Sequence, residues 1–436
     1  MDYAELPYML YADEKGRVYD HPYYRMAGFS GDCPVHIKAG ELLPLPEFSK
    51  LFYIPDSHPV GLDPETGEYL IVEDIETENG ISPCFAVSAF MEPGIVRTLL
   101  PAADYSLKSY LLPTWAYTAV GFKDGKYRAA GLWIEYNKRW DPRNYDDTDL
   151  VPAIENYKKN HMCKGLVAHL IDCATDNHCF AAKNLFLERW EAPIPVSRQC
   201  NASCLGCLSL QPDSGFCASH YRISERPSKD EIVSLAVSHL DKAPVPIVSF
   251  GQGCEGEPLT EHRLIAESIR EIRKRTKRGT INLNTNGSMP EQLRIIIESG
   301  LDSVRISMNS ARPSFYHRYY RPKTYTFDDV IQSILISGEL GVYTMVNYLV
   351  FPGITDQKEE VAALKTLLKE TGVNFLHLKN LCIDPQLYIN RMPPCHFPGM
   401  GIKNMIEEIK DSFPDLTVGY FNQPVQDARP EKRGCF

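Results

Sequence analysis

In the second half of the chain, short apolar runs alternate with longer segments in which apolar residues recur every three or four positions. The short runs predict strands, and they span 193–198, 245–250, 280–286, 303–309, 344–350 and 374–380. The longer segments predict helices, and they span 228–240, 261–278, 289–300, 326–341 and 357–372. Six such units in sequence predict an α/β fold with a parallel sheet, either open and doubly wound or curled into a barrel. In both cases ligands bind at the carboxyl ends of the strands.

The first part of the chain has a different pattern. Short apolar runs such as 84–91 and 128–136 are separated by Pro, Gly and Tyr, which predicts strands and turns, and residues 147–190 show helical spacing. We therefore expect a strand-rich α+β accessory or cap domain over residues 1–190. The βα units then form a second domain over residues 191–425, and residues 426–436 form a tail.

Composition narrows the functional classes. The 436 residues are 44% hydrophobic, which is enough for two domains with sizeable cores. The net charge of -10 argues against non-specific binding of nucleic acid or an anionic membrane. The acidic start and the lack of a run of about eighteen uncharged apolar residues predict a soluble, cytoplasmic protein without membrane contact. Thirteen cysteines, an odd number in a long chain, predict reduced thiols.

Three cysteines lie close together after the first predicted strand. Cys200, Cys204 and Cys207 have the spacing C-x3-C-x2-C. Three thiolates in eight residues can ligate three corners of a cube-shaped iron-sulfur cluster and leave the fourth iron open for a cosubstrate. A structural zinc ion with Cys217 or His220 as its fourth ligand is an alternative, and unligated thiols are another.

This triplet, ahead of a chain of βα units, resembles the radical S-adenosylmethionine superfamily. Matching residues follow the later strands: Gly256, Glu257 and Pro258 after the second, Asn284 and Asn286 at the third, Ser307 and Asn309 at the fourth, and Asn347 and Val350 at the fifth. The resemblance covers about residues 192–425 and implies a partial (β/α)6 TIM-like barrel. It also implies that the cysteine triplet binds a 4Fe-4S cluster and that the other residues bind S-adenosylmethionine.

The resemblance further implies a reaction. The reduced 4Fe-4S cluster would cleave S-adenosylmethionine, and the resulting 5'-deoxyadenosyl radical would abstract hydrogen from an unidentified substrate, for which a small molecule is the leading expectation. A flavodoxin- or ferredoxin-type protein would donate the low-potential electron, and the enzyme would be oxygen-sensitive. Radical modification of a peptide, protein or RNA is an alternative. A non-catalytic zinc-binding regulatory protein is an alternative from another class.

The sequence departs from the family pattern at two positions. Relatives commonly carry an aromatic residue just before the third cysteine, where this chain has Gly206, so adenine packing is expected from Phe250 or the fifth strand. Cys254 lies inside the Gly-Glu-Pro loop, where we expect it to pack as a small apolar residue. Cys163, Cys173 and Cys179 are too widely spaced to predict a second cluster.

Two further segments lie near the predicted cavity. Cys382, just past the sixth strand, is a candidate catalytic residue that donates a hydrogen atom or quenches a radical, since its S–H bond is weak; the alternative is a solvated loop. Arg318, Arg321 and Lys323 could clamp an anionic substrate, or they could form an ordinary helix surface followed by a loop.

Overall fold

The computed structural model describes residues 3–77, 80–160, 165–211 and 218–425. Within these ranges a seven-stranded sheet has the order β17-β18-β19-β20-β21-β22-β23, and all its neighbouring strands are parallel. The strands are β17 (Glu191–Pro193), β18 (Ile247–Phe250), β19 (Thr280–Thr285), β20 (Ser303–Met308), β21 (Tyr343–Val350), β22 (Phe375–Asn380) and β23 (Thr417–Gly419). Because sequence order equals spatial order, every connection crosses in the same direction. This arrangement confirms the predicted α/β class.

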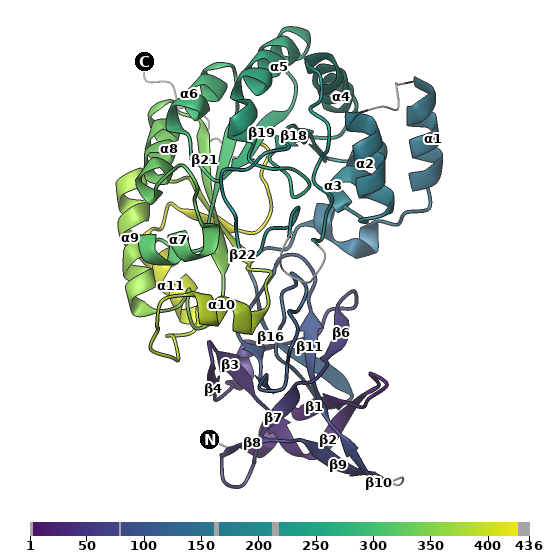
Figure 1. Cartoon of the computed structure of the whole chain (residues 1–436), viewed down its shortest axis with the longest axis vertical. Coiled ribbons are helices and arrows are strands. Elements are labelled where there is room, and N and C mark those ends of the chain that lie inside the picture. Colours follow the sequence, from purple (N-terminus) through teal and green to yellow (C-terminus); the bar gives the residue numbers. More distant parts are fainter. Residues whose placement is uncertain (1–2, 78–79, 161–164, 212–217, 426–436) are drawn as a thin grey trace.

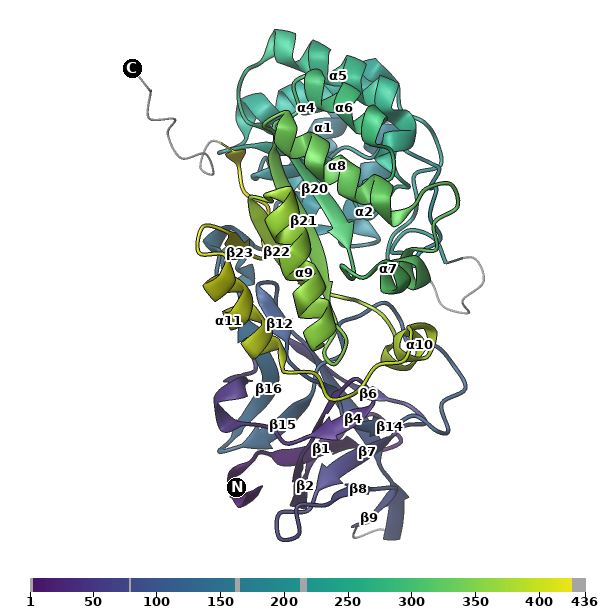
Figure 2. The same ribbon diagram turned by 90° about the vertical axis from the view of Figure 1, so that its left-hand side faces the viewer.

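Helices lie in an arc along the outside of this sheet (Figures 1 and 2). They are α4 (Lys229–Lys242), α5 (His262–Arg275), α6 (Pro290–Glu298), α8 (Phe327–Glu339), α9 (Lys358–Thr371) and α11 (Ile402–Ser412). Two short helices, α7 (Pro313–Tyr320) and α10 (Pro385–Arg391), lie apart from this arc and follow β20 and β22 in the chain. Capping boxes at Ser228 and Thr326 start α4 and α8, because each side chain accepts from the backbone three residues on. Gly372 ends α9 in the left-handed conformation.

The first strand differs from its prediction. The apolar run 193–198 predicts a strand, whereas β17 is Glu191–Pro193 and shares only Pro193 with that range. Pro193 and Pro195 have no backbone N–H to donate, so the ladder ends early although Ile194 and Val196 are fully buried. The strand ends five residues sooner than the predicted range, at Pro193 rather than at residue 198, and this lengthens the loop that carries the cysteine triplet.

The preceding residues form a module of antiparallel strands (Figure 1). Its strands are β1 (Tyr8–Ala12), β2 (Val18–Met26), β3 (Gly28–Ser30), β4 (Cys33–Val35), β5 (Leu42–Pro44), β6 (Lys50–Ile54), β7 (His58–Leu62), β8 (Tyr69–Ile71), β9 (Asp74–Thr77), β10 (Gly80–Pro83), β11 (Phe85–Phe90), β12 (Ile95–Arg97), β13 (Leu100–Pro101), β14 (Ala103–Asp104), β15 (Val120–Lys123) and β16 (Lys126–Trp133). Three helices follow, α1 (Leu150–Asn160), α2 (Leu166–Thr175) and α3 (Phe180–Phe186), and they share the apolar core of the parallel sheet. Across the described ranges, the helices are too short or too polar to cross a membrane.

The antiparallel module packs against the carboxyl end of β22 (Figure 2). The Asn380 side chain accepts from the backbone N–H of Arg97 at 2.9 Å and donates to the carbonyl of Ile95 at 2.9 Å. The fully buried Arg97 guanidinium donates to the Leu381 carbonyl at 2.7 Å. Past this strand, Lys108 and Asp384 form an ion pair at 2.6 Å whose side chains are 2% and 0% exposed. The module therefore packs against the carboxyl end of β22, on the edge of the sheet where ligands of parallel sheets bind.

Candidate functional site

The cysteine triplet lies in the loop that follows β17, and helix α7 fixes that loop. The backbone N–H groups of Ser203 and Leu205 donate to the carbonyls of Tyr320 and Tyr319, both at 3.0 Å. Cys200, Cys204 and Cys207 are free and half-buried. Burial raises the pKa of the Cys200 thiol to about 11 and that of Cys204 well above its ordinary value, and the neighbouring thiols add to both effects. Three crowded thiols are a donor set that favours a bound cation.

Basic side chains surround this loop. The Arg222 guanidinium donates to Cys207 Sγ at 3.5 Å, Arg321 Nε donates to the Ser203 carbonyl, and Lys323 Nζ donates to the Cys200 carbonyl at 3.4 Å. They border a cavity of about 400 Å³ that Cys204 and Cys207 also line. Arg321 and Lys323 therefore hold the loop itself, which is a role that the sequence did not predict for them.

The Gly-Glu-Pro segment pairs with the backbone just before the triplet. The N–H of Gly256 donates to the Ser197 carbonyl at 2.7 Å, and the N–H of Glu257 donates to the Gln199 carbonyl at 2.8 Å. A Cβ atom on residue 256 would lie 2.0 Å from the Gln199 carbonyl oxygen, so the approach requires glycine. Pro258 follows at the first position of the 3₁₀ helix Pro258–Glu261.

The carboxylate of Glu257 links the second and third strand ends. It accepts from Thr285 Oγ1 at 2.5 Å, from the N–H of Asn286 at 2.9 Å and from the N–H of Leu259 at 3.0 Å. Burial raises its pKa to about 7, and these hydrogen bonds oppose the rise. Both carboxylate oxygens have protein partners, so the Glu257 side chain positions the turn after β19.

Asn286 and Asn284 occupy the carboxyl end of β19. Asn286 Nδ2 donates to Asn201 Oδ1, inside the cysteine loop, at 2.9 Å. Asn284 Nδ2 instead donates to the Phe250 carbonyl at 3.1 Å, between β18 and β19. The ends of the first three strands and the cysteine loop thus form one hydrogen-bonded unit.

The next two strands place Ser307 and Asn347 opposite each other. They are partners in the β20–β21 ladder, and Asn347 Nδ2 donates to Ser307 Oγ at 3.1 Å. Asn347 Oδ1 is shielded from solvent and has no hydrogen-bond partner. A shielded acceptor without a donor suits a ligand hydroxyl or amine. Val350, at the end of β21, is fully buried, and its carbonyl accepts from the N–H of Leu381 at 2.9 Å.

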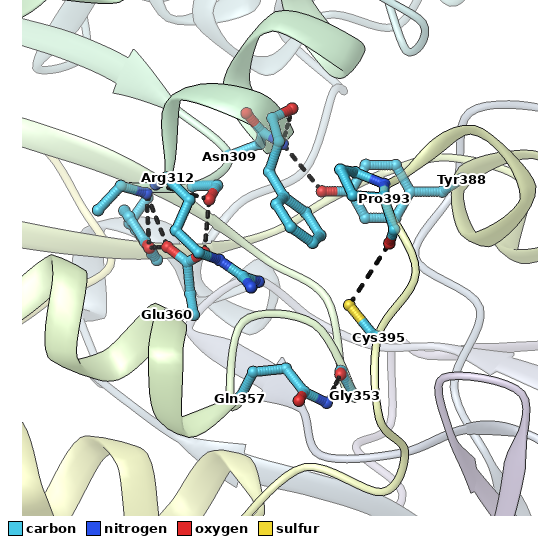
Figure 3. Close-up of polar contacts among 12 residues, drawn as sticks. Asn309, Arg312, Gly353, Gln357, Glu360, Tyr388, Pro393 and Cys395 are labelled. Carbon is cyan, nitrogen blue, oxygen red and sulfur yellow. Dashed lines mark hydrogen bonds and ion pairs between the residues drawn. The ribbon is translucent and has the colours of Figure 1, made fainter.

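Asn309 lies deeper, in the turn after β20 (Figure 3). Its Nδ2 donates to the Tyr388 hydroxyl at 3.0 Å, and its side chain is fully buried. The buried carboxylate of Glu360, on α9, holds the same turn by accepting from the N–H of Ala311 and from Arg312 Nε, both at 2.7 Å. Asn309 Oδ1 is also buried without a partner.

Cys382 lies beside the cysteine loop. Its carbonyl oxygen is 3.2 Å from the point where a Cβ on residue 206 would stand, and the Tyr319 hydroxyl is 3.0 Å from the same point. Burial raises the pKa of the Cys382 thiol. The Tyr319 ring occupies the space beside Gly206, whereas the Phe250 side chain is fully buried in the core.

Sequence reasoning missed Glu255. Its buried carboxylate accepts from four backbone N–H groups, those of Val196 at 2.8 Å, Ser197 at 2.9 Å, Gly251 at 2.6 Å and Gln252 at 3.1 Å. It therefore joins the ends of β17 and β18. The sequence signal for Glu255 is its place as a second acidic residue in the glycine-rich loop, two residues before Glu257 of the Gly-Glu-Pro segment.

Comparison with known proteins relates the segment that carries this site to a protein family. Residues 194–364 match the model of the radical SAM superfamily. The match covers less than half of the chain and marks a radical SAM domain within it. A probable GTP 3',8-cyclase of Methanosarcina acetivorans is 27% identical over 200 residues, which are 44% of this chain and 55% of that protein. The chain thus spans about half the length of this curated relative.

Solved structures give weaker likenesses to this chain. Native anSMEcpe with bound AdoMet is 18% identical with a TM-score of 0.39, over 53% of this chain and 64% of that one. Streptococcus suis SuiB bound to the precursor peptide SuiA is 13% identical with a TM-score of 0.39, over 61% of this chain and 55% of that one.

The cofactors of the radical SAM domain are a 4Fe-4S cluster and S-adenosylmethionine, and the residues present fit both. The triplet offers three free thiols in one loop, two of which line a cavity with cationic side chains beside them. Asn347 offers a shielded acceptor on a neighbouring strand end. The predicted family membership and cofactors are confirmed, whereas the individual site residues remain predictions.

Proposed function

We propose that this protein is a radical SAM enzyme whose substrate is a small anionic molecule. The observation that carries the proposal is the construction of the cysteine loop. Its free thiols Cys204 and Cys207 border a cavity, Cys200 lies in the same loop, and the Gly-Glu-Pro segment pairs with the residues just before the triplet. When bound, the reduced cluster and S-adenosylmethionine supply a 5'-deoxyadenosyl radical that abstracts a hydrogen atom from the substrate.

In this proposal Cys200, Cys204 and Cys207 ligate the cluster. Gly256, Glu257 and Pro258 hold the loop that meets the methionyl group, and hydrogen bonds among Asn284, Asn286 and their neighbours fix the third strand end. Asn347 Oδ1 accepts a hydrogen bond from the cosubstrate, and Ser307 orients the Asn347 amide. Asn309 and Val350 support these strand ends from the buried side.

Cationic side chains support an anionic substrate. Arg222, Arg321, Lys323 and Arg391 line the cavity, and its described lining includes no acidic side chain. The relative from Methanosarcina acetivorans is named for a nucleotide, GTP, which is also anionic. We propose the same chemical class here, a molecule with phosphate or carboxylate groups.

Cys382 is proposed as the hydrogen-atom donor that ends the reaction. Its S–H bond would break, the hydrogen atom would pass to the substrate radical, and the resulting thiyl radical would recover one electron and one proton. The raised pKa keeps the thiol protonated, and its place beside the cysteine loop supports the role. The recovering electron and the initial electron would both come from a flavodoxin- or ferredoxin-type donor.

The antiparallel module supports a cap function. We propose residues 1–190 as this cap, residues 191–425 as a partial (β/α)6 barrel and residues 426–436 as a tail. The in-order parallel sheet supports the barrel, and the buried Lys108–Asp384 pair at its carboxyl edge supports exclusion of water. The ten described cysteines are all free, which supports a reducing, cytoplasmic location.

Anaerobic reconstitution tests the proposal. Wild-type protein should bind about four iron atoms and cleave S-adenosylmethionine to 5'-deoxyadenosine after reduction. A Cys204→Ala variant should lose both properties, and Cys33→Ser, a change in strand β4 outside the cysteine loop, should keep both. Colourless protein that does not cleave S-adenosylmethionine would refute the proposed radical SAM activity. Deuterium transfer into 5'-deoxyadenosine from the low-mass fraction of a labelled extract would support a small substrate, and transfer only from the peptide or RNA fraction would refute it.

A further inference from the structure

Three histidine and cysteine side chains meet outside the cysteine loop, and a fourth lies beside them. His169, Cys173 and Cys254 place their ligand atoms within 4.8 Å of one another. His169 and Cys173 are one turn apart on α2, and Cys254 comes from the loop after β18. Cys173 and Cys254 are 1% and 2% exposed. The three residues thus join a helix that precedes the family-matched segment to the loop that carries Gly256.

His220 lies beside this group, outside the 4.8 Å distance that its three members satisfy. Its Nδ1 atom is shielded from solvent and has no hydrogen-bond partner. Its ring lies near enough to Cys173 and His169 for electrostatic interaction with both, and it borders Gly253, the residue before Cys254. A shielded imidazole nitrogen without a partner is costly, and a bound metal ion would satisfy it.

We propose that His169, Cys173, His220 and Cys254 bind one structural zinc ion. Two thiolates and two imidazoles are a common tetrahedral ligand set for zinc. In such a site, zinc–sulfur and zinc–nitrogen bonds of about 2.3 and 2.0–2.1 Å place sulfur and nitrogen about 3.6 Å apart. The observed distance from Cys173 Sγ to His169 Nε2 is 3.6 Å. One ion fits better than a cluster, because ligands of a cluster bind different metal atoms and stand further apart.

The ion would tie three segments together around the proposed cosubstrate site. The N–H of Ile223 donates to the Cys254 carbonyl at 2.9 Å, and the N–H of His220 donates to the Leu208 carbonyl, next to Cys207, at 2.9 Å. The sequence could not predict this site, because its ligands come from three separate segments. Cys254, which was expected to pack as a small apolar residue, would instead be a ligand.

Metal analysis of cluster-free protein tests the zinc site independently of the proposed enzyme activity. A Cys204→Ala variant purified anaerobically should hold about one zinc ion per chain. Adding His169→Ala or Cys254→Ala should remove it, while adding Cys33→Ser should leave it in place. Loss of zinc in Cys204→Ala itself would overturn the proposal, because it would place zinc on the triplet. Protein without zinc, iron in its place, or a Cys173–Cys254 disulfide found by peptide mapping would also overturn it.

A spectroscopic measurement covers the case in which these variants fail to fold. X-ray absorption on zinc-loaded Cys204→Ala protein should show two sulfur ligands at about 2.3 Å and two nitrogen ligands at about 2.0–2.1 Å. In His220→Ala protein, one nitrogen ligand should be lost. A shell made only of sulfur, or a spectrum that is unchanged by His220→Ala, would refute the assignment.

Discussion

The pairing between Gly256 and the residues before the cysteine triplet gives a sharp test of the site. A Gly256→Ala change would place Cβ 2.0 Å from the Gln199 carbonyl oxygen and 2.5 Å from its carbonyl carbon. Real Cβ contacts are essentially never shorter than 3.0 Å, so the two segments must separate by about 1 Å. Because Cys200 follows Gln199 directly, the separation would displace the first cluster ligand.

The cost follows from the contacts that hold this approach. Two backbone hydrogen bonds, at 2.7 and 2.8 Å, would weaken or break, and each contributes about 0.5–1.5 kcal/mol net. We therefore expect a loss of about 1–3 kcal/mol of stability. A displacement of about 1 Å in a reacting group costs roughly 10²-fold in rate, so cleavage of S-adenosylmethionine should fall by about that factor.

The assay compares iron content, denaturation midpoint and the initial rate of 5'-deoxyadenosine formation in reconstituted protein. Gly338→Ala is the matched control, because its Cβ would meet only the Thr371 carbonyl, at 3.7 Å, on the exposed side of α8. That control should keep the rate and gain up to about 1 kcal/mol of stability. A Gly256→Ala protein with wild-type rate and stability would show that this contact does not position the cluster loop.

Three other perturbations follow from the same contacts. Asn347→Ala should raise the KM for S-adenosylmethionine roughly 2- to 10-fold at unchanged iron content, since one hydrogen bond is lost; an unchanged KM would remove Asn347 from the binding site. Lys108→Met should lower the free energy of unfolding in urea by about 3–5 kcal/mol, because it leaves the Asp384 carboxylate buried and unpaired. A Lys108→Met/Asp384→Leu double variant should recover most of the loss, and no recovery would contradict this explanation. Burial raises the pKa of Glu255 and Glu257 from 4.5 to about 7, so between these pH values the folded state binds more protons than the unfolded state. The free energy of unfolding should therefore fall as pH rises through that window, by up to about 3 kcal/mol per group. Urea midpoints of cluster-free protein should show the fall, and a midpoint that rises with pH there would refute this explanation.

The sequence predicted the parallel sheet well, because buried parallel strands and amphipathic helices leave different periodicities. The second to sixth strands overlap their predicted ranges closely, and Ser228 and Thr326 mark helix starts by side-chain chemistry that is local in sequence. The first strand was misplaced because apolar character reports burial, while pairing also needs N–H donors that Pro193 and Pro195 lack.

Contacts between distant segments could not be predicted in this way. Asn380 bonds to Ile95 and Arg97 across more than 280 positions, and no periodicity records such a pairing. The role of Glu255 depends on four backbone N–H groups from two strand ends, which become neighbours only after folding. The residue types at the site were visible in the sequence, but their hydrogen-bond partners were not.

Residues 206 and 319 share one small volume of the molecule. The Tyr319 hydroxyl and the Cys382 carbonyl fill the space beside Gly206, so a larger residue at 206 has room only if residue 319 becomes smaller. The two positions should therefore vary together among homologues, with an aromatic ring at one and a small residue at the other. In a mutational library they would behave as a single site, and an aromatic introduced at 206 alone would press the cysteine loop away from α7.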